Sequence, residues 1–376
     1  MPIYLDCNAT TPVEPLVREE MLKYITTEFG NAGSRTHVFG TRANQAVEQA
    51  RSSIADLAAA SRDEVVFTSG ATESNNLALL GLAQHGASVG KRHIVSTQIE
   101  HKAVLEPLEQ LGRRGYEVTL VPPTAGGWVD PEAIRKALRP NTLLVSVMHV
   151  NNETGVIQPL EDIAGVLGEH AAFFHTDAAQ GYGKHLAPLR NPRIDLISIS
   201  AHKIYGPKGV GALVMRRRGY TRPPLEPLFY GGGQERGLRP GTLPVFLIAG
   251  FGKAAELALK NAERRATVCR AFKEALMVAL QPLGPTVNGD PQQTLPHVVN
   301  LSFPRLDSEA VMLALKDYVA ISNGAACTSA SYQPSHVLKA MGLRDDEVQC
   351  AVRWSWCHMT EAPDWDAVVR AIRRLL

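Results

Sequence analysis

The chain has 376 residues, of which 45% are apolar and 20% are charged, and 39 basic against 37 acidic side chains leave a net charge of +2. This length is enough for two or three domains with large buried cores. The near-neutral balance argues against binding to nucleic acid or to a membrane surface through bulk charge, and no apolar run approaches the about 18 residues of a membrane-spanning helix. We therefore expect a soluble, enzyme-sized protein with no direct nucleic-acid or membrane partner.

The cysteine content argues against a disulfide framework. There are five cysteines, an odd number, and they are scattered without a Cys-x-x-Cys pair: Cys7, Cys269, Cys327, Cys350 and Cys357. A zinc site is equally disfavoured, so we expect no metal and a reducing, cytoplasmic location. The first residues also lack the basic start of a signal peptide. The odd count leaves room for one reactive thiol.

Short apolar runs alternate with helix-like segments through the first two thirds of the chain. We predict buried strands over residues 65–67, 94–96, 117–121, 143–150, 173–176 and 196–200, with helices such as those after His101 and from Pro131 between them. This alternation predicts a mainly parallel sheet with helices on both faces. Ligands of such sheets bind beyond the carboxyl ends of the strands, so the residues that follow each strand matter most.

The pattern changes near residue 220. An irregular Pro- and Gly-rich stretch precedes a long helix predicted from about Val245 to Leu280. A second αβ unit follows, with strands over 298–303 and 319–322, a helix from Asp307 or Ser308 and a terminal helix from about Trp365. We expect a large domain of residues 15–257 and a small domain of residues 1–14 plus 258–376.

Three strand ends carry groups with a common chemistry. The first strand is followed by a hydroxyl-rich turn (68–76) at the start of a helix. Free N–H groups and the helix dipole at this place suit a phosphate. The same residue types are also typical of an ordinary helix N-cap. Asp177 ends a very apolar strand and needs a cationic partner. Lys203 directly follows another buried strand, where an amine nucleophile is well placed.

Pyridoxal phosphate requires these three features together: a lysine that forms a Schiff base, an acid for the pyridine nitrogen and a helix N-terminus for the phosphate. Asp177 and Lys203 taken alone would fit a structural ion pair. His101 begins a helix where its ring could stack on a flat cofactor, and Asn152 follows a strand and offers an amide. Each of the last two would otherwise be read as a cap or turn residue.

The motifs of the whole chain, in order, resemble those of the NifS/IscS-type (group I) cysteine desulfurases, which are class V, fold-type I pyridoxal-phosphate enzymes. The segments that carry the resemblance are YLDCNATTP (4–12), SGATESNN (69–76), EHKAV (100–104), HVNNETG (149–155), TDAAQ (176–180), AHKIYGPKG (201–209), GGGQERGLRPGTLP (231–244) and CTSAS (327–331). The resemblance implies an α/β fold with a mainly parallel seven-stranded sheet in the large domain and a smaller C-terminal α+β domain.

The resemblance also implies a role for each matching residue. Lys203 matches the lysine that binds the cofactor covalently, Asp177 the partner of the pyridine nitrogen and His101 the residue stacked on the ring. Gln180 and Asn152 match ligands near the ring hydroxyl, and Asn152 also lies near the substrate. Arg353 matches the arginine that holds the substrate carboxylate. The phosphate ligands that it implies are Ala71, Thr72, Ser200, His202 and, from the other subunit of a homodimer, Thr242.

Cys327 decides which reaction is expected. It lies in a run of small residues that has no apolar stripe to pack, whereas Cys269 and Cys350 fit packing positions better. A bland loop cysteine is the alternative. The family pattern makes Cys327 the nucleophile that takes sulfur from L-cysteine as a persulfide, leaving L-alanine, and then passes the sulfur to an acceptor protein.

The chain departs from the commonest family pattern at Cys7, Ala201 and Pro240, none of which removes a catalytic group; for Cys7 a packing role is expected ahead of a redox one. Overall the chain is most similar to pathway-dedicated desulfurases, including the DndA-type enzymes of DNA phosphorothioation, with iron–sulfur cluster assembly as the other destination for sulfur. Two rivals stay open: another class V enzyme, such as a selenocysteine lyase or an aminotransferase, and a persulfide carrier that has lost the cofactor.

Overall fold

The larger part of the protein is built on a seven-stranded sheet. The computed structural model describes residues 1–324 and 334–376. In the sheet the strands are ordered β2-β8-β7-β6-β5-β3-β4, and only β8 runs antiparallel to its neighbours. The strands are β2 (Val65–Thr68), β3 (His93–Thr97), β4 (Glu117–Val121), β5 (Thr142–Ser146), β6 (Phe173–Asp177), β7 (Leu196–Ser200) and β8 (Gly211–Met215). The predicted mainly parallel α/β sheet is confirmed.

Helices cover both faces of this sheet because successive strand residues point to opposite sides. Phe67 and Ile197 pack into a core with α2, α7 and the first half of α8, whereas the adjacent Val66 and Leu196 pack into a second core with α3 and α5. The helices of this part are α1 (Pro15–Thr26), α2 (Val38–Leu57), α3 (Ala71–Gly81), α4 (Ala83–Ser88), α5 (Lys102–Arg113), α6 (Pro131–Ala137), α7 (Leu160–Leu167) and α8 (Val245–Leu280).

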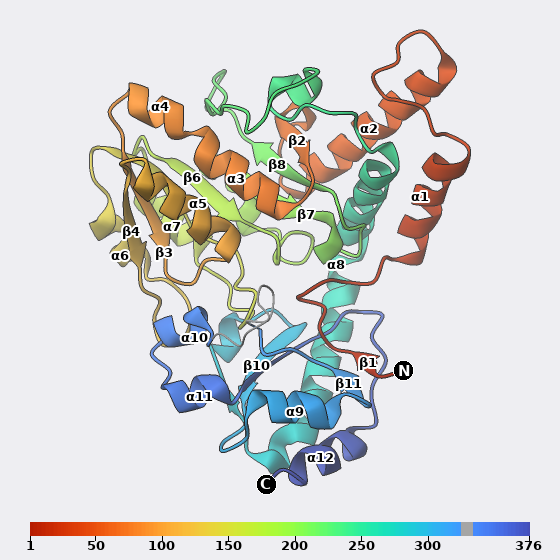
Figure 1. Ribbon diagram of the computed structural model, residues 1–376, viewed down its shortest axis with the longest axis vertical. Coiled ribbons are helices and arrows are strands. Elements are labelled where there is room, and N and C mark those ends of the chain that lie inside the picture. Colours follow the sequence, from red (N-terminus) through yellow and green to blue (C-terminus); the bar gives the residue numbers. More distant parts are fainter. Residues whose placement is uncertain (325–333) are drawn as a thin grey trace.

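The long helix α8 connects the upper and lower parts of the molecule (Figure 1). Its first turns pack under the large sheet, and its last turns, with Cys269, Leu276 and Leu280, enter a separate core in the lower part. There β10 lies between β12 and β9 in an antiparallel sheet, and β1 pairs in parallel with β11. The remaining elements are β1 (Ile3–Tyr4), β9 (Thr286–Val287), β10 (Val298–Ser302), α9 (Ser308–Leu315), β11 (Val319–Ala320), α10 (His336–Ala340), α11 (Asp345–Gln349), β12 (Ala351–Ser355) and α12 (Trp365–Arg373).

Two strands end at least two residues earlier than the sequence predicts. The apolar run 143–150 predicts one strand, but β5 ends at Ser146, and Val147 and Val150 stay buried in the loop that follows. The strand predicted over 319–322 is two residues long, because Ser322 leaves the pairing with β1 and forms a bridge with Arg353 of β12 instead. At both places, residues remain buried after the strand has ended, so hydrophobicity alone overestimates strand length.

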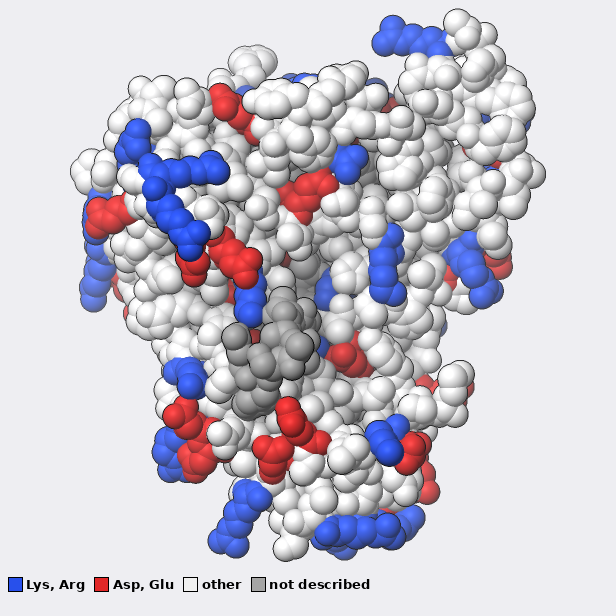
Figure 2. Space-filling model, viewed as in Figure 1, with Lys and Arg blue, Asp and Glu red and all other residues white. Residues whose placement is uncertain are grey.

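The surface carries interspersed charges. On the face shown in Figure 2, basic and acidic side chains lie close to one another over both the upper and the lower parts. This distribution agrees with a net charge of +2 over the whole chain. None of the described helices is long and apolar enough to cross a membrane.

Candidate active site

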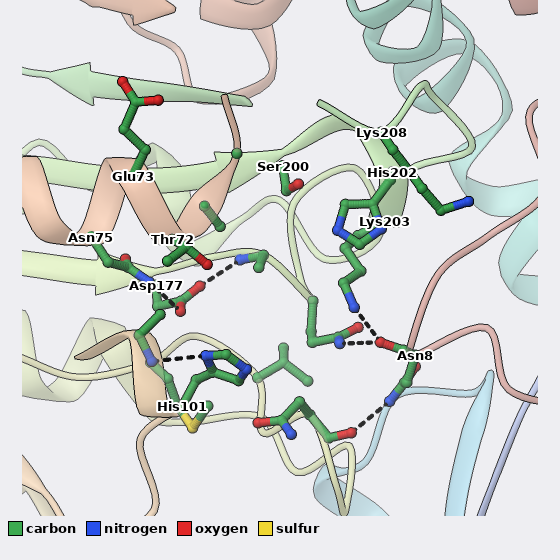
Figure 3. Close-up of a pocket in the computed structure, with 18 of the residues that line it drawn as sticks. Asn8, Thr72, Glu73, Asn75, His101, Asp177, Ser200, His202, Lys203 and Lys208 are labelled. Atoms are coloured by element: carbon green, nitrogen blue, oxygen red, sulfur yellow. Dashed lines mark hydrogen bonds between the residues drawn. The ribbon is translucent and has the colours of Figure 1, made fainter. Parts of the chain in front are cut away.

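A cavity of about 400 Å³ lies beyond the carboxyl ends of the strands of the large sheet. Its walls come from segments far apart in the sequence: the N-terminal loop at Asn8, the start of α3, the ends of β6 and β7, and Arg353 of β12. In the view of Figure 3, Asp177 and Lys203 lie on opposite sides of the cavity and His101 lies below the space between them. The position matches the rule that open α/β sheets bind ligands at strand ends.

Lys203 projects from a short turn, Ala201–Lys203, that directly follows β7. Its ammonium group donates hydrogen bonds to the main-chain carbonyls of Asn8 and, at 2.8 Å, of Ala9. Thr11 helps to fix this turn by donating a hydrogen bond to the carbonyl of His202. Tyr205, which follows the turn, adopts a positive φ of 68°. A non-glycine residue at such a φ is uncommon and is held by its surroundings.

Asp177 is the last residue of β6, and its side chain is oriented by two donors. The main-chain N–H of Ala179 donates to Oδ1 at 2.9 Å, and the side-chain amide of Asn75 donates to Oδ2 at 2.7 Å. Asp177 is only 6% exposed and Asn75 is fully buried. These two hydrogen bonds fix the orientation of the carboxylate, and its remaining lone pairs stay available to a group in the cavity.

His101 is the N-cap residue of α5, and its ring nitrogen Nδ1 accepts a 3.0 Å hydrogen bond from the N–H of Ala103. Burial lowers the pKa of His101 below its ordinary value. The imidazole is therefore neutral at physiological pH, and the acceptor role of Nδ1 leaves the proton on Nε2. A neutral, flat ring at this place suits stacking on an aromatic ligand.

The start of α3 is the part of the cavity whose chemistry suits an anion. Ala71 and Thr72 are its first residues and line the cavity together with Ser200 and His202. The positive end of a helix dipole and its free N–H groups favour a phosphate. Burial, followed by the charge of Lys203, lowers the pKa of His202 to about 4, so this ring is also neutral. Its Nδ1 lies 3.1 Å from the hydroxyl of Thr10.

Arg353 closes the cavity from the second part of the molecule. The side chain is 1% exposed, Nη2 pairs with Oδ1 of Asp6 at 2.6 Å, and Nη1 donates to the carbonyl of Asn152 at 3.0 Å. Its Nε has no hydrogen-bond partner within residues 1–324 and 334–376. A guanidinium with an N–H group that lacks a partner among the described residues suits a carboxylate in the cavity.

The donor set fits pyridoxal phosphate. A lysine amine, a carboxyl group and a helix N-terminus face one cavity, each from a different strand end. Several polar atoms here are buried without a partner in the described part of the chain: Asn8 Oδ1, Asn75 Oδ1, Gln180 Oε1 and Arg353 Nε. Buried polar atoms are normally hydrogen-bonded, so such a group of orphaned atoms around one cavity is consistent with a polar ligand.

The structure brings most of the sequence-predicted residues together. Those that line the cavity are Ala71, Thr72, His101, Asn152, Asp177, Gln180, Ser200, His202, Lys203 and Arg353. Thr242 instead lines a separate cavity of about 220 Å³ beside Gln234 and Leu243. Cys327 lies outside the described residues, so the structure does not place it.

Sequence reasoning missed several lining residues, of which Asn8 and Asn75 matter most. Asn8 accepts from Lys203, accepts from Gln180 at 2.9 Å and donates to the carbonyl of Asn152 at 3.1 Å. The signal for Asn75 was available, since it lies three residues after Thr72 on the same helix face. Asn8 lies within the YLDCNATTP segment, but the segment does not predict these contacts, because a loop docked from a distant part of the chain makes them.

Residues 3–368 match the family described as "Aminotransferase class-V". The chain belongs to the class-V aminotransferase family. This family depends on pyridoxal phosphate, and the predicted cofactor and class V membership are confirmed.

Individual relatives within the class-V aminotransferase family indicate which kinds of enzyme in the family the chain resembles. The chain is 48% identical, over 98% of its length and 91% of the relative's, to a protein of Anaeromyxobacter dehalogenans named cysteine desulfurase IscS. It is 50% identical to DndA of Streptomyces lividans, with a TM-score of 0.83 and coverage of 94% of this chain and 99% of that one. A structure described as SspA in complex with cysteine is 37% identical, with a TM-score of 0.83 over 96% of this chain and all of that one. The predicted resemblance to NifS/IscS-type desulfurases is confirmed.

Proposed function

We propose that this chain is a pyridoxal-phosphate-dependent cysteine desulfurase, a transferase that converts L-cysteine to L-alanine and passes the sulfur to an acceptor protein. The observation that carries the proposal is one cavity faced by Lys203, Asp177 and the N-terminus of α3. The relatives named as cysteine desulfurases and the neighbour described as holding cysteine supply the substrate.

The residues that would hold the cofactor divide into three groups. Lys203 binds it covalently, Asp177 bonds the ring nitrogen, and His101 stacks on the ring, with Gln180 and Asn152 near the ring hydroxyl. The phosphate group is held by Ala71, Thr72, Ser200 and His202. Bound pyridoxal phosphate supplies an electron sink that accepts the charge left when a bond to the substrate α-carbon breaks.

Lys203 would hold the cofactor and would act as the general base toward the substrate. Its amine is positioned by the carbonyls of Asn8 and Ala9. An amine held beside the α-carbon removes its proton and later returns one to the product. Arg353 binds the substrate carboxylate and so fixes which bond at the α-carbon faces Lys203.

Cys327 is the proposed nucleophile. Its thiolate attacks the sulfur of the substrate, the carbon–sulfur bond of the substrate breaks, and Cys327 becomes a persulfide while the carbon product leaves as alanine after protonation. A free cysteine has a pKa of about 8.5, so deprotonation by the substrate or by neighbouring groups is required at neutral pH.

The chain acts as a homodimer in this proposal, with Thr242 reaching the phosphate site of the partner subunit. The support is that Thr242 lines a cavity separate from the one around Lys203 in its own chain. Large apolar side chains on α1, on the loop that follows it and on α2 are also exposed: Leu22, Ile25, Phe29 and Val38. Exposed apolar groups of this kind mark protein interfaces. Light scattering of the purified protein tests the dimer.

A division into residues 15–257 and residues 1–14 plus 258–376 is also proposed. Its support is the change of core within α8, from Ala258 under the large sheet to Cys269 in the lower core, and the pairing of β1 with β11. The N-terminal loop thus contributes Asn8 to the cavity from the small domain.

The sulfur acceptor is a protein of DNA phosphorothioation or of iron–sulfur cluster assembly, in the cytoplasm. The similarity to DndA supports the first and the similarity to proteins named IscS the second. A local surface is expected to recognise the acceptor, because the net charge of +2 offers no strong field. Following radiolabelled sulfur from the enzyme onto proteins captured with it distinguishes the two pathways.

The proposed activity is tested by measuring alanine and sulfide formed from L-cysteine in the presence of a thiol reductant. Wild type forms both in equal amounts, and Cys327→Ser forms neither at a comparable rate. Cys350→Ser is the matched control and keeps full activity. Unchanged turnover in Cys327→Ser would point to a selenocysteine lyase or aminotransferase, and a colourless protein that binds no cofactor would point to a persulfide carrier.

A further inference from the structure

Two cysteines that the proposed reaction does not use lie against each other behind the active site. Cys7 and Cys357 belong to one small buried cluster with Tyr205, and they are 1% and 2% exposed. The backbone brings them together, because the N–H of Cys7 donates to the carbonyl of Ser355 at 3.0 Å and the N–H of Asn8 donates to its hydroxyl at 2.9 Å. The N-terminal loop therefore runs alongside the end of β12.

The contact between the two thiols is polar as well as apolar. The two thiols share one buried cluster, and the hydroxyl of Thr360 donates to Sγ of Cys357 at 3.5 Å. The neighbouring Cys7 thiol lowers the pKa of Cys357, and the Cys357 thiol raises that of Cys7. The ammonium of Lys184 lies close enough to favour the Cys357 thiolate further.

The other described cysteines lack this arrangement. Cys269 is buried in the apolar core around Leu276 and Leu280, and burial raises its pKa to about 12. Burial also raises the pKa of Cys350, which has no cysteine among the groups that act on it. A thiol that only fills space would resemble these two, whereas a low-pKa thiol beside a second thiol is typical of reactive pairs.

We propose that Cys7 and Cys357 form a dithiol site that a hydroperoxide oxidises to an intramolecular disulfide. The Cys357 thiolate attacks one peroxide oxygen, the O–O bond breaks, and the alcohol or water leaves with a proton. The sulfur of Cys7 then attacks the resulting sulfenic acid, the S–O bond breaks and water leaves with the thiol proton. Two thiols are oxidised by two electrons in all, and the peroxide is reduced by two.

Each cysteine of the site lies next to a segment that reaches the active site. Cys7 precedes Asn8, whose carbonyl accepts hydrogen bonds from Lys203 and Gln180, and Cys357 lies two residues after the last residue of β12, the strand that carries Arg353. A disulfide would tie the loop that holds Lys203 to the strand that holds Arg353. Because both thiols are buried, oxidation proceeds through local opening of the short N-terminal strand and is slower than that of an exposed thiol.

The experiment uses the reduced, desalted holoenzyme treated with hydrogen peroxide. Free thiols are then alkylated, the protein is digested, and cross-linked peptides are identified by mass spectrometry. The expected product is a peptide pair joined through Cys7 and Cys357 that disappears on reduction with dithiothreitol. The same cross-link is expected in Cys327→Ser, so its formation does not depend on the proposed desulfurase activity.

Single substitutions separate this pair from its neighbours. Cys7→Ser and Cys357→Ser each abolish the cross-link, whereas the matched controls Cys269→Ser and Cys350→Ser retain it. Two results would overturn the proposal: oxidation of wild type that joins Cys357 to Cys269, or peroxide treatment that leaves Cys7 and Cys357 fully alkylatable under denaturing conditions. The measurement on wild type decides the matter even where a variant folds poorly.

Discussion

The side-chain amide of Asn75 donates a 2.7 Å hydrogen bond to Oδ2 of Asp177, and both residues are buried at the edge of the active-site cavity. Asn75 comes from the first turns of α3, the helix whose N-terminus lines the cavity, and Asp177 ends β6. In the proposed site, one helix thus serves both the phosphate and the ring of the cofactor. The contact keeps the acid oriented toward the position proposed for the pyridine nitrogen.

Replacing Asn75 with leucine is expected to weaken binding of pyridoxal phosphate about 10- to 100-fold. A hydrogen bond to a charged group contributes about 1.5–3 kcal/mol, and its loss leaves only the N–H of Ala179 to orient the carboxylate. Asn76→Leu is the matched control, because Asn76 donates to the carbonyl of Thr72 and does not line the cavity. Equal affinities of the two variants, measured by titrating apoenzyme with the cofactor, would contradict the role given to Asn75.

Lys203→Arg is expected to lower turnover by at least about 10²- to 10⁴-fold, since a guanidinium keeps the charge but cannot form a Schiff base or act as the general base. The variant also loses the visible absorbance of lysine-bound cofactor. Lys208→Arg, which alters another lysine that lines the cavity, retains both. Normal absorbance in Lys203→Arg would show that a different amine binds the cofactor.

Arg353→Lys is expected to raise KM for L-cysteine about 10- to 100-fold and to change kcat less. Lysine preserves the charge opposite Asp6, but it cannot form two parallel hydrogen bonds to a carboxylate. Steady-state kinetics measure the split, and thermal unfolding checks that the ion pair still supports the fold. A fall in kcat at unchanged KM would assign Arg353 to the chemical step instead.

Folding stability is expected to fall as pH drops below about 6.5. Burial lowers the pKa of His149 and of His175 to about 3, so the native state keeps both neutral while the unfolded state protonates them below their ordinary value of 6.5. The stability is therefore fully present above pH 6.5 and is lost progressively toward pH 3.

Urea unfolding at pH 7.5 and 5.5 measures this loss, and one such histidine contributes about 1.4 kcal/mol of it. His175→Gln is expected to reduce the difference between the two pH values by that amount, even though the variant loses the contacts of His175 with Ser146 and Ser198. An unchanged difference would mean that His175 is protonated in the native state.

Local patterns in the sequence predict most strands of the large sheet and part of the set of residues that line the cavity. Strands β4 and β7 and helix α8 begin and end where the apolar periodicity predicts. Asp177 and Lys203 stand out in the sequence. Asp177 ends one buried strand and Lys203 closely follows another, and burying a charged group there is costly unless it has a partner. Strand β8 and helices α1 and α2 are not predicted, since none of the motifs of the sequence lies in those segments.

The sequence alone determined which groups the protein carries for its chemistry: an amine, an acid, an arginine and a helix start, in an order that resembles one enzyme family. Tertiary structure decided which of them meet. Docking of the N-terminal strand on β11 places the carbonyl of Asn8 on Lys203 and the thiol of Cys7 against Cys357, although more than 190 and 340 residues separate them in the chain. Such contacts depend on how the two cores pack against the N-terminal loop, and local periodicity in the sequence does not predict that packing.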